Sequence, residues 1–458
     1  MTLLALFHDD AAHASPKIAE RSAAEECGCN VRGLGQRCGA MGYEEFAARL
    51  IEHGIITDPW LEGQPRFASA PLILERAELA ELAEVAEELA EAFDELTWRA
   101  REDESWLDFL ALTPWQRAMF EMGGEAWHGL ARADLFRTDD GWVTTELNCD
   151  TPTGEAEAVV LGALCTHAGC MDLDGGARAI DVNRNLGAAF LAMNERYLQE
   201  LTAAGAPRTV GIVYPTEFVE DLALVRLYRG WFERAGFEVV LGSPFNLEID
   251  EHDRVSLFGT PITLLWRHYK TDWWGERECA FDDEGFEDVS PLERELTLIA
   301  RAERARTLVV VNPMSAVVPQ NKRAMALFWE RLPRFSTRTQ RIVRATIPPT
   351  FRLETRDRAQ LLADKDQWVL KSDYGAEGDE VIVGKLVSPE LFEASLAHAR
   401  PGRWVVQRRF DPVERAGKVV NYGVYLCAGR TCGVYARMHP ADQITGESAL
   451  SVPVLVRA

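Results

Sequence analysis

The sequence predicts a mixed fold, with an α/β layer in the middle of the chain and an α+β region at its C-terminal end. Residues 71–101 are rich in Ala, Glu and Leu, and their apolar side chains recur every three or four positions, as in an amphipathic helix. Residues 209–245 alternate strand, helix and strand patterns, and residues 351–458 hold several short strands. The alternation favours a doubly wound layer, and the strand-rich end favours α+β.

The first half of the chain is expected to be mostly helical until a polar hairpin. A second helical pattern covers residues 114–132, and a strand follows at 133–137. Residues 138–141 end in Asp-Gly, which favours a tight turn. The return strand is expected at 142–148 and a further helix at 156–165.

The βαβ pattern resolves into a strand at 209–214, a helix at 220–234 and a strand at 237–241. Apolar runs at 262–266 and 308–311 add two buried strands to the same layer. After the helix that opens the C-terminal region, strands are expected at 368–371, 380–384, 404–407, 419–426 and 431–437.

The composition narrows the class of protein. The 458 residues include 49 Lys+Arg and 72 Asp+Glu, which gives a formal charge of −23 and argues against nucleic acid as a partner. The length fits about three domains or one large composite fold. Apolar runs fall far short of the roughly 20 residues that span a bilayer, and the N-terminus lacks a basic signal-peptide region. We expect a cytoplasmic protein with no membrane partner.

Nine cysteines are scattered along the chain, and one group of three stands out near the N-terminus. Cys27 and Cys29 are separated by a single residue, and Cys38 follows. Structural zinc usually needs four ligands at wider spacing, and the nearest histidines are His13 and His53. Reduced loop thiols and a zinc site both stay open, and the first is favoured.

The predicted hairpin carries the most informative side chains. Arg132 and Asp134 are two apart on one strand, so they share a face. Glu146, Asn148 and Asp150 alternate in the same way on the return strand. Carboxylate and amide oxygens suit Mg²⁺ with phosphates, and an arginine beside them suits a planar anion. A solvent-facing polar hairpin with routine ion pairs is the alternative interpretation.

Further cations and polar groups lie in the C-terminal part. Lys371 ends a strand before the Gly-bearing loop 375–378, an arrangement that can hold phosphates but equally marks a sheet edge. Lys322 precedes a helical stretch. Gln407 and Arg437 lie on later strands, where they line a pocket or simply a sheet edge.

Together these pieces resemble the glutathionylspermidine synthase-like ATP-grasp family. The string ELNCDTPT at 146–153, with Arg132 and Asp134 before it, is the most specific part. The resemblance covers about residues 110–458. The later matching pieces follow in order: Asn321-Lys322, Lys371, Glu377-Gly378, Gln407, and Arg437 with Ile444-Thr445-Gly446.

The resemblance implies an ATP-grasp fold with a Rossmann-like pre-ATP-grasp layer and a helical N-terminal region. It also implies an ATP- and Mg²⁺-dependent ligase that joins a carboxylate to an amine through an acyl phosphate and releases ADP. The expected regions are a mostly helical part at 1–110, a synthetase core with the hairpin at 111–205, the pre-ATP-grasp layer at 206–315 and the nucleotide-binding lobes at 316–458.

Site roles carry over by the same resemblance. Arg132 is the catalytic residue that grips the reacting groups. The oxygen ligands of two Mg²⁺ ions are Asp134, Glu146 and Asn148. The acid-binding residues are Asp150, Thr151 and Thr153. The ATP-binding residues are Lys322, Lys371, Glu377, Gly378, Gln407 and Arg437.

Two departures from the family pattern bear on the substrate. The phosphate loop usually reads Ser-Arg-Glu-Gly, but here residues 375–378 are Gly-Ala-Glu-Gly and the arginine is missing. Gly154-Glu155 stands where Ser-Leu is more usual. These changes argue against glutathione, and to a lesser degree against spermidine, as the substrates. The expected partners are a small-molecule or peptide-like carboxylate and a cationic amine. The missing arginine also leaves open a catalytically silent ATP-grasp scaffold that binds a nucleotide or peptide.

A metal-dependent hydrolase is a weaker alternative, because no histidine pair lies near the acids and two separated lysines are present. The identity of both substrates, the role of residues 1–110 and the oligomeric state stay open.

Overall fold

The computed structural model describes most of the chain after residue 41. The predicted cysteine group at Cys27, Cys29 and Cys38 lies outside the described residues, as do Glu377 and Gly378. The described ranges are 42–124, 126–166, 170–173, 176–201, 207–216, 219, 221–276, 291–375, 380–415, 417–446 and 448–458.

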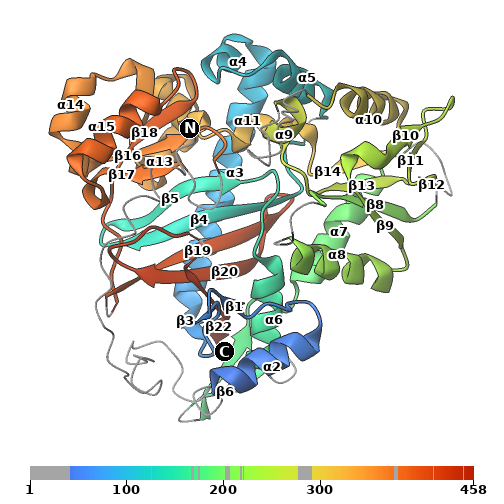
Figure 1. Cartoon of the computed structure of the whole chain (residues 1–458), viewed down its shortest axis with the longest axis horizontal. Helices are drawn as coiled ribbons and strands as arrows, with labels where there is room; N and C mark the ends of the chain where they lie inside the picture. Colours follow the sequence, from blue (N-terminus) through green and yellow to red (C-terminus); the bar gives the residue numbers. More distant parts are fainter. Residues whose placement is uncertain are drawn as a thin grey trace.

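A five-stranded antiparallel sheet forms the centre of the molecule (Figure 1). The predicted hairpin supplies two neighbouring strands of this sheet, and the C-terminal region supplies the other three. Segments far apart in sequence therefore share one sheet. Its order is β21 (Leu450–Val452), β20 (Arg430–Pro440), β19 (Lys418–Cys427), β4 (Leu130–Thr138) and β5 (Gly141–Asn148).

The two faces of this sheet differ in chemistry because alternate side chains point to opposite sides. One face carries buried apolar residues such as Leu135, Val424 and Ala436, which share one apolar core with side chains of the long helix α3 (Arg76–Glu102). That helix runs across the strands of the sheet (Figure 1). The other face carries the polar residues that the sequence singled out.

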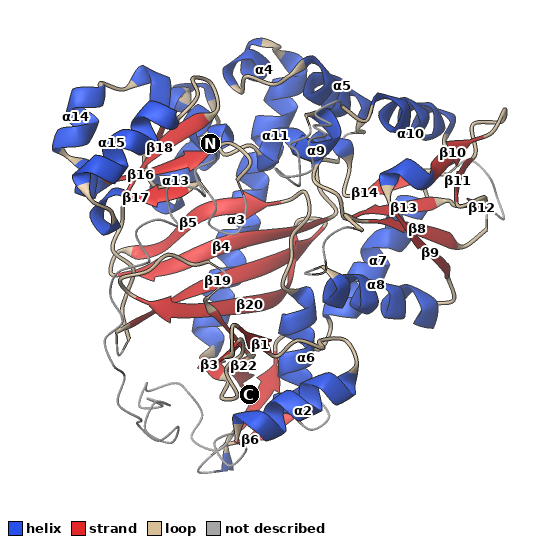
Figure 2. Cartoon of the chain, in the orientation of Figure 1, coloured by secondary structure: helices blue, strands red, loops and turns tan. Residues whose placement is uncertain are grey.

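A parallel four-stranded sheet lies beside the central sheet and confirms the predicted doubly wound layer (Figure 2). Helix α8 (Leu222–Arg234) links two of its strands, as the βαβ pattern predicted, and α7 (Leu186–Leu198) belongs to the same core. The strand order is β14 (Val309–Val311), β13 (Leu264–Arg267), β8 (Thr209–Val213) and β9 (Glu238–Gly242).

A small antiparallel sheet with two helices forms a third lobe near the β5 edge of the central sheet (Figure 1). Its apolar side, with Leu370 and Val406, packs against α14 (Arg358–Ala363) and against α15 (Pro389–His398), which contributes Phe392. The strand order is β15 (Thr350–Arg352), β18 (Trp404–Arg408), β16 (Trp368–Ser372) and β17 (Val381–Val383).

Two predicted helices are shorter than the sequence pattern indicated. Leu72–Leu74 forms a strand, β3, because this apolar run pairs in parallel with β22 (Val454–Arg457) at the other end of the chain. Helix α5 (Pro114–Met122) ends before Gly123 and Gly124, so β4 begins where the periodicity still predicted helix. From residue 42 onward, the described N-terminal part combines helices with short strands.

The remaining elements include strands of further sheets. Among the described residues, no helix is both long enough and apolar enough to cross a membrane. The elements are α2 (Tyr43–His53), β1 (Trp60–Leu61), β2 (Gln64–Pro65), α4 (Ser105–Phe109), α6 (Glu155–Cys165), β6 (Cys170–Asp172), β7 (Arg178–Asp181), β10 (Leu247–Ile249), β11 (Val255–Leu257), β12 (Thr260–Pro261), α9 (Thr271–Gly275), α10 (Glu293–Ala305), α11 (Val317–Gln320), α12 (Arg323–Glu330) and α13 (Thr337–Thr346).

Candidate active site

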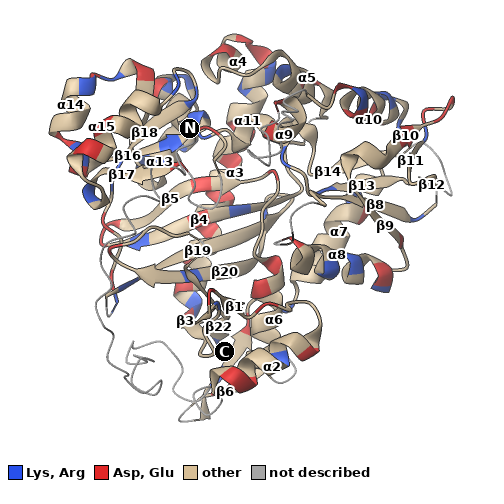
Figure 3. Cartoon of the chain, viewed as in Figure 1, with Lys and Arg blue, Asp and Glu red and all other residues tan. Residues whose placement is uncertain are grey.

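The polar face of the central sheet gathers the predicted hairpin residues with residues from the C-terminal strands. Arg132 lies opposite Asn148 on β5 and opposite Tyr425 on β19. Asp134 lies opposite Glu146 on β5. Figure 3 shows acidic positions on β4 and β5 beside a basic position on β4. The sheet register confirms that these side chains share one face.

A β-bulge at Thr145 sets which side chain faces Asp134. The register shifts between Asp134 and Leu135, so Leu135 pairs with Thr144 while Asp134 pairs with Glu146. In a regular ladder without the bulge, Thr145 would lie opposite Asp134. The Glu146 carboxylate would then point to the apolar face. The sequence alternation alone gives no signal for this bulge.

Arg132 and Asp134 form a bidentate ion pair that is almost fully buried. The Nε–Oδ1 distance is 2.6 Å and the Nη2–Oδ2 distance is 2.9 Å. Nη2 of Arg437 also donates to Oδ2 of Asp134, at 3.1 Å, and to Oδ1 of Asn421, at 3.2 Å. Nε of Arg437 is buried and has no hydrogen-bond partner among the described residues, so it is available to a bound anion.

Gly423 makes room for Arg132. It lies opposite Asp134 on β19, and a Cβ atom there would approach Cδ of Arg132 to 2.6 Å. Nη1 of Arg132 donates to the carbonyl oxygen of Thr153 at 2.7 Å, which fixes the far end of the guanidinium. Arg132 therefore lies across Gly423, and hydrogen bonds to Asp134 and to the Thr153 carbonyl hold its guanidinium on two sides.

Lys322 and Lys371 meet this sheet face from different segments. Lys322 lies between α11 and α12, and its Nζ is 3.4 Å from Oε2 of Glu146. Lys371 lies on β16, and its Nζ donates to the carbonyl oxygen of Thr145 at 3.1 Å. Nζ of Lys322 also donates to the carbonyl oxygen of Gly375, at the start of the predicted phosphate loop.

The charges of this cluster shift its pKa values. Burial alone would raise the pKa of Glu146, but Lys322, Lys371 and Arg132 outweigh it and hold that pKa well below the usual range. Burial lowers the pKa of Lys371 to about 8, although Glu146 opposes this effect. Burial would lower the pKa of Arg132, but its pairing with Asp134 raises it. Glu146 is thus an anion among cations.

Asp150 is buried and held by other protein groups. It is 2% exposed, and its Oδ1 lies 2.5 Å from Nη2 of Arg267 on β13. Its Oδ2 accepts hydrogen bonds from the backbone N–H and the hydroxyl of Thr271. Asp150 therefore ties the loop after β5 to the parallel sheet.

Thr151 and Thr153 lie half-buried on the loop between β5 and α6. The Thr153 carbonyl accepts from Tyr425 Oη at 3.0 Å as well as from Arg132.

Gln407 and Lys371 share one face of the third lobe. They lie on the paired strands β18 and β16, where Gln407 is opposite Val369 and Lys371 is opposite Val405. Nε2 of Gln407 donates to Oγ1 of Thr350 at 2.9 Å, and the side chain is buried. These two predicted nucleotide residues thus point to one side.

Two residues to which the sequence analysis assigned no site role hold the loop after β5 in place. The Gln320 side-chain oxygen accepts from the backbone N–H groups of Cys149, at 2.8 Å, and Asp150, at 3.1 Å. Asn312 donates through Nδ2 to the carbonyl oxygens of Leu130 and Asp150. Asn312 directly follows a buried strand of the parallel sheet, and polar groups at this end of a parallel strand often belong to a binding site. That position in the sequence could have pointed to Asn312.

The oxygen donors fit Mg²⁺ that arrives with a nucleotide. Among the described residues, no group of three or more His, Cys, Asp and Glu side chains is arranged to hold a metal ion. Magnesium, however, usually takes one or two carboxylates and completes its shell with phosphate and water. The carboxylates of Asp134 and Glu146 and the amide of Asn148, whose Nδ2 lies 3.3 Å from Oε1 of Glu146, provide that donor set.

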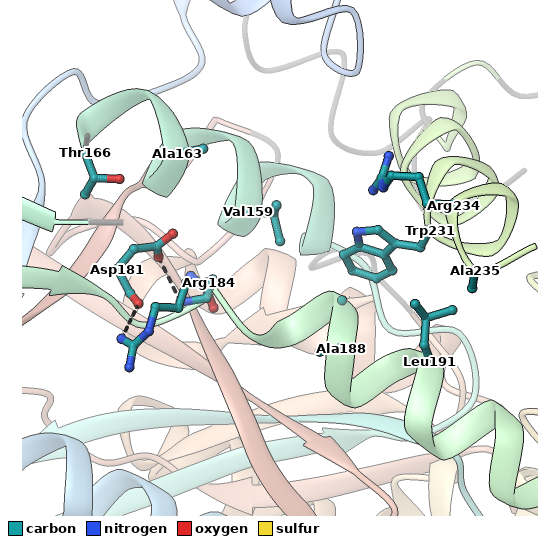
Figure 4. A pocket seen from close by; sticks show the side chains of 12 residues that line it. Val159, Ala163, Thr166, Asp181, Arg184, Ala188, Leu191, Trp231, Arg234 and Ala235 are labelled. Atoms are coloured by element: carbon teal, nitrogen blue, oxygen red, sulfur yellow. Dashed lines mark hydrogen bonds between the residues drawn. The ribbon is translucent and has the colours of Figure 1, made fainter. Parts of the chain in front are cut away.

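A hollow of about 610 Å³ lies elsewhere, between α6, α7 and α8 (Figure 4). Its walls include Val159, Asp181 and Trp231, with the exposed Arg184 and Arg234 at its margin. None of the charged-cluster residues lines it.

Solved structures of other proteins were found to match this chain. A glutathione synthetase-like effector from Globodera pallida, solved in its apo form, matches with a TM-score of 0.52 and 11% identity, over 89% of this chain and 94% of that chain. A protein provisionally described as a gamma-glutamylcysteine synthetase from Methylobacillus flagellatus matches with a TM-score of 0.45 and 13% identity, over 84% of this chain and 89% of that chain.

No curated protein matches by sequence. The family described as glutathionylspermidine synthase preATP-grasp matches residues 63–457, which is most of the chain. This match confirms the resemblance and, with the Globodera structure, the predicted ATP-grasp class of fold. The chain belongs to the glutathionylspermidine synthase preATP-grasp family.

Proposed function

We propose that this protein is an ATP-dependent carboxylate–amine ligase that releases ADP and phosphate. Family membership supports a synthetase-type ligase. The observation that carries the finer proposal is the meeting of Lys322 and Lys371 at residues 145–146 of β5, beside the paired Arg132 and Asp134. Two cations from different segments, next to oxygen donors on a rigid sheet, suit a triphosphate and an acid substrate.

The lysines are the proposed phosphate contacts. Lys322 and Lys371 would donate hydrogen bonds from their ammonium groups to phosphate oxygens in place of Glu146 and the Thr145 carbonyl. Glu377 and Gly378 follow Gly375 in sequence, and Lys322 already contacts that glycine. Gln407, on the same face as Lys371, would lie on the adenine side, and Arg437 would add a second guanidinium beside the reacting groups.

Arg132 is the proposed holder of the acid substrate. Three of its five N–H donors bind Asp134 and the Thr153 carbonyl, which leaves two for a substrate carboxylate. The unpartnered Nε of Arg437 offers another donor on the same face. Thr151 and Thr153, on the adjoining loop, are the proposed hydroxyl contacts. Asp150 acts on the acid indirectly, through the position of that loop.

The chemistry follows in two steps that balance. A carboxylate oxygen of the acid attacks the γ-phosphorus of ATP, and the bond to the β-phosphate oxygen breaks to release ADP. The neutral amine nitrogen then attacks the acyl carbon, a proton leaves the nitrogen, and phosphate departs with its electron pair. The guanidinium of Arg132 stabilises negative charge on the carbonyl oxygen during the second step.

Asp134, Glu146 and Asn148 would hold up to two Mg²⁺ ions, whose contribution is to neutralise charge on the nucleotide phosphates. The protein would take a small or peptide-like acid and a cationic amine. The formal charge of −23 favours a cationic partner over an anionic one.

A direct test measures ADP release from ATP and Mg²⁺ with pools of acids and amines, with a mass-spectrometric search for the condensed product. ADP and a condensed product are expected, and both should fall together in a Lys371→Met variant. Release of AMP and pyrophosphate would overturn the acyl phosphate route. Tight nucleotide binding without ADP release from any pool would instead identify a silent scaffold.

A further inference from the structure

Two thiols meet at the end of the β19–β20 hairpin. Sγ of Cys427 lies 3.3 Å from Sγ of Cys432, and Sγ of Cys432 lies 3.4 Å from the Tyr425 carbonyl oxygen. Both cysteines are free. No step of the proposed ligation uses them.

The hairpin register explains why these side chains meet. The turn residues Ala428 and Gly429 both have positive φ, 47° and 78°, which is typical of a tight two-residue turn. Cys427 pairs with Arg430, but the register then shifts, and Tyr425 pairs with Gly433. Arg430 shares a face with Cys427, and Cys432 is two residues further along the strand, so the alternation places both thiols on one face, with Cys432 as the extra residue of the bulge.

We propose that Cys427 and Cys432 are a reversible oxidation site that forms an intramolecular disulfide with a peroxide as the oxidant. The Cys432 thiol first takes one oxygen from hydrogen peroxide to give a sulfenic acid and one water. The Cys427 thiol then attacks that sulfur, and a second water leaves. Two thiols lose two electrons and two protons, and one peroxide becomes two waters.

The surroundings decide the order and speed of these steps. Cys427 is 8% exposed, whereas Cys432 is half-buried, so peroxide reaches Cys432 first. The neighbouring Cys427 thiol and burial raise the pKa of Cys432 well above its usual value, so little thiolate forms at neutral pH. Oxidation should therefore be slow at pH 7 and faster at alkaline pH. The sulfurs must close from 3.3 Å to about 2.0 Å, a shift that side-chain rotation can supply.

The thiols lie close to the loop that the active-site arginine contacts. Tyr425, two residues before Cys427, donates to the Thr153 carbonyl, which also accepts from Arg132. Oxidation would remove the thiol proton that Cys432 directs at the Tyr425 carbonyl or the other sulfur. The site itself does not depend on the proposed ligase function.

Trypsin gives a sharp test, because it cleaves after Lys418, Arg430 and Arg437 and so separates the two cysteines. The protein is treated with hydrogen peroxide, its free thiols are blocked, and the digest is analysed by mass spectrometry. We expect peptides 419–430 and 431–437 to be joined, with a combined mass about 2 Da below their sum, and to separate on reduction.

Matched variants decide the result. Cys427→Ser and Cys432→Ser should each abolish the joined peptide, whereas Cys170→Ser, at a half-buried cysteine elsewhere, should leave it unchanged. If either serine variant folds poorly, the peptide analysis of the unsubstituted protein still tests the proposal. The proposal is overturned if both cysteines stay free, or become separately oxidised, under conditions in which peroxide modifies other cysteines of the same sample.

Discussion

Nζ of Lys322 lies 3.4 Å from Oε2 of Glu146, although one residue precedes α12 and the other lies on the central sheet. Lys371, from the third lobe, contacts the adjacent Thr145 carbonyl. Three separate parts of the fold therefore meet over two residues of β5. A substitution at any one of them should act on the same site.

Replacement of Glu146 by Gln should lower ADP formation by about 100-fold or more, because it removes the anion that faces both lysines. The fold should survive, since the Glu146 side chain is partly exposed and Gln has the same shape. Coupled-enzyme detection of ADP and a thermal melt measure the two effects. Glu248→Gln, at an exposed position of β10, is the control, and normal turnover of Glu146→Gln would remove the metal-ligand assignment.

Nucleotide binding should depend on both lysines. Lys322→Met and Lys371→Met should each weaken the binding of a non-hydrolysable ATP analogue by about 10-fold to 100-fold, the usual loss of a charge-assisted hydrogen bond. Titration calorimetry gives the affinities. Lys385→Met, at a half-exposed lysine on the same lobe, should leave affinity unchanged. Unaltered affinity in both buried-lysine variants would contradict the proposed phosphate contacts.

Gly423→Ala should displace Arg132 without unfolding the sheet. The added methyl group would lie 2.6 Å from Cδ of Arg132, and a flexible side chain moves more easily than a strand. We expect kcat/KM for the acid substrate to fall by about 10-fold to 100-fold. Gly429→Ala, in the distant turn, is unsuitable as a control because its positive φ would strain the alanine. Gly433→Ala on β20 is the better steric control. A variant with unchanged kinetics would show that Arg132 does not need this position.

Asp150→Asn should reduce stability more than it reduces substrate affinity. The change leaves the fully buried guanidinium of Arg267 without its charge partner, which typically costs about 3–5 kcal/mol of unfolding free energy. Urea denaturation measures this loss. Asp58→Asn, at an exposed carboxylate in an ion pair with Arg66, should cost far less. Near-normal stability with a raised KM for the acid would instead place Asp150 in direct contact with the substrate.

The stability of the protein should fall with rising pH because of Glu155. This residue is 0% exposed, its oxygens have no hydrogen-bond partner among the described residues, and burial raises its pKa to about 8. The folded chain keeps this proton until about pH 8, whereas the unfolded chain releases it near pH 4.3. Between these values the folded state binds more protons, so stability declines as pH rises.

Glu155→Gln should remove the contribution of Glu155 to this dependence, which amounts to at most about 1.4 kcal/mol per pH unit. Denaturant titrations between pH 5 and 8 provide the measurement, with Glu248→Gln as the exposed comparison. Identical slopes in the Glu155→Gln variant and the unvaried protein would show that Glu155 does not carry the effect.

Local patterns in the sequence were enough to predict the βαβ unit and the hairpin around the Asp-Gly turn. Alternation along 142–148 and the three- and four-residue period of 220–234 are short-range signals, and β5 and α8 formed within a few residues of them. The string at 146–153 identified the family, and the match over residues 63–457 confirmed it. The shared face of Arg132 and Asp134 also followed from the period of a strand.

Only the tertiary structure decided what each segment contacts. Leu72–Leu74 is a strand because β22 pairs with it, and no local pattern separates a short apolar helix start from a strand. The bulge at Thr145, the buried partner of Asp150 and the approach of Gly423 to Arg132 likewise depend on strands and loops far away in sequence. Residue spacing encodes which side a side chain faces, whereas its neighbour on that side is fixed by long-range packing.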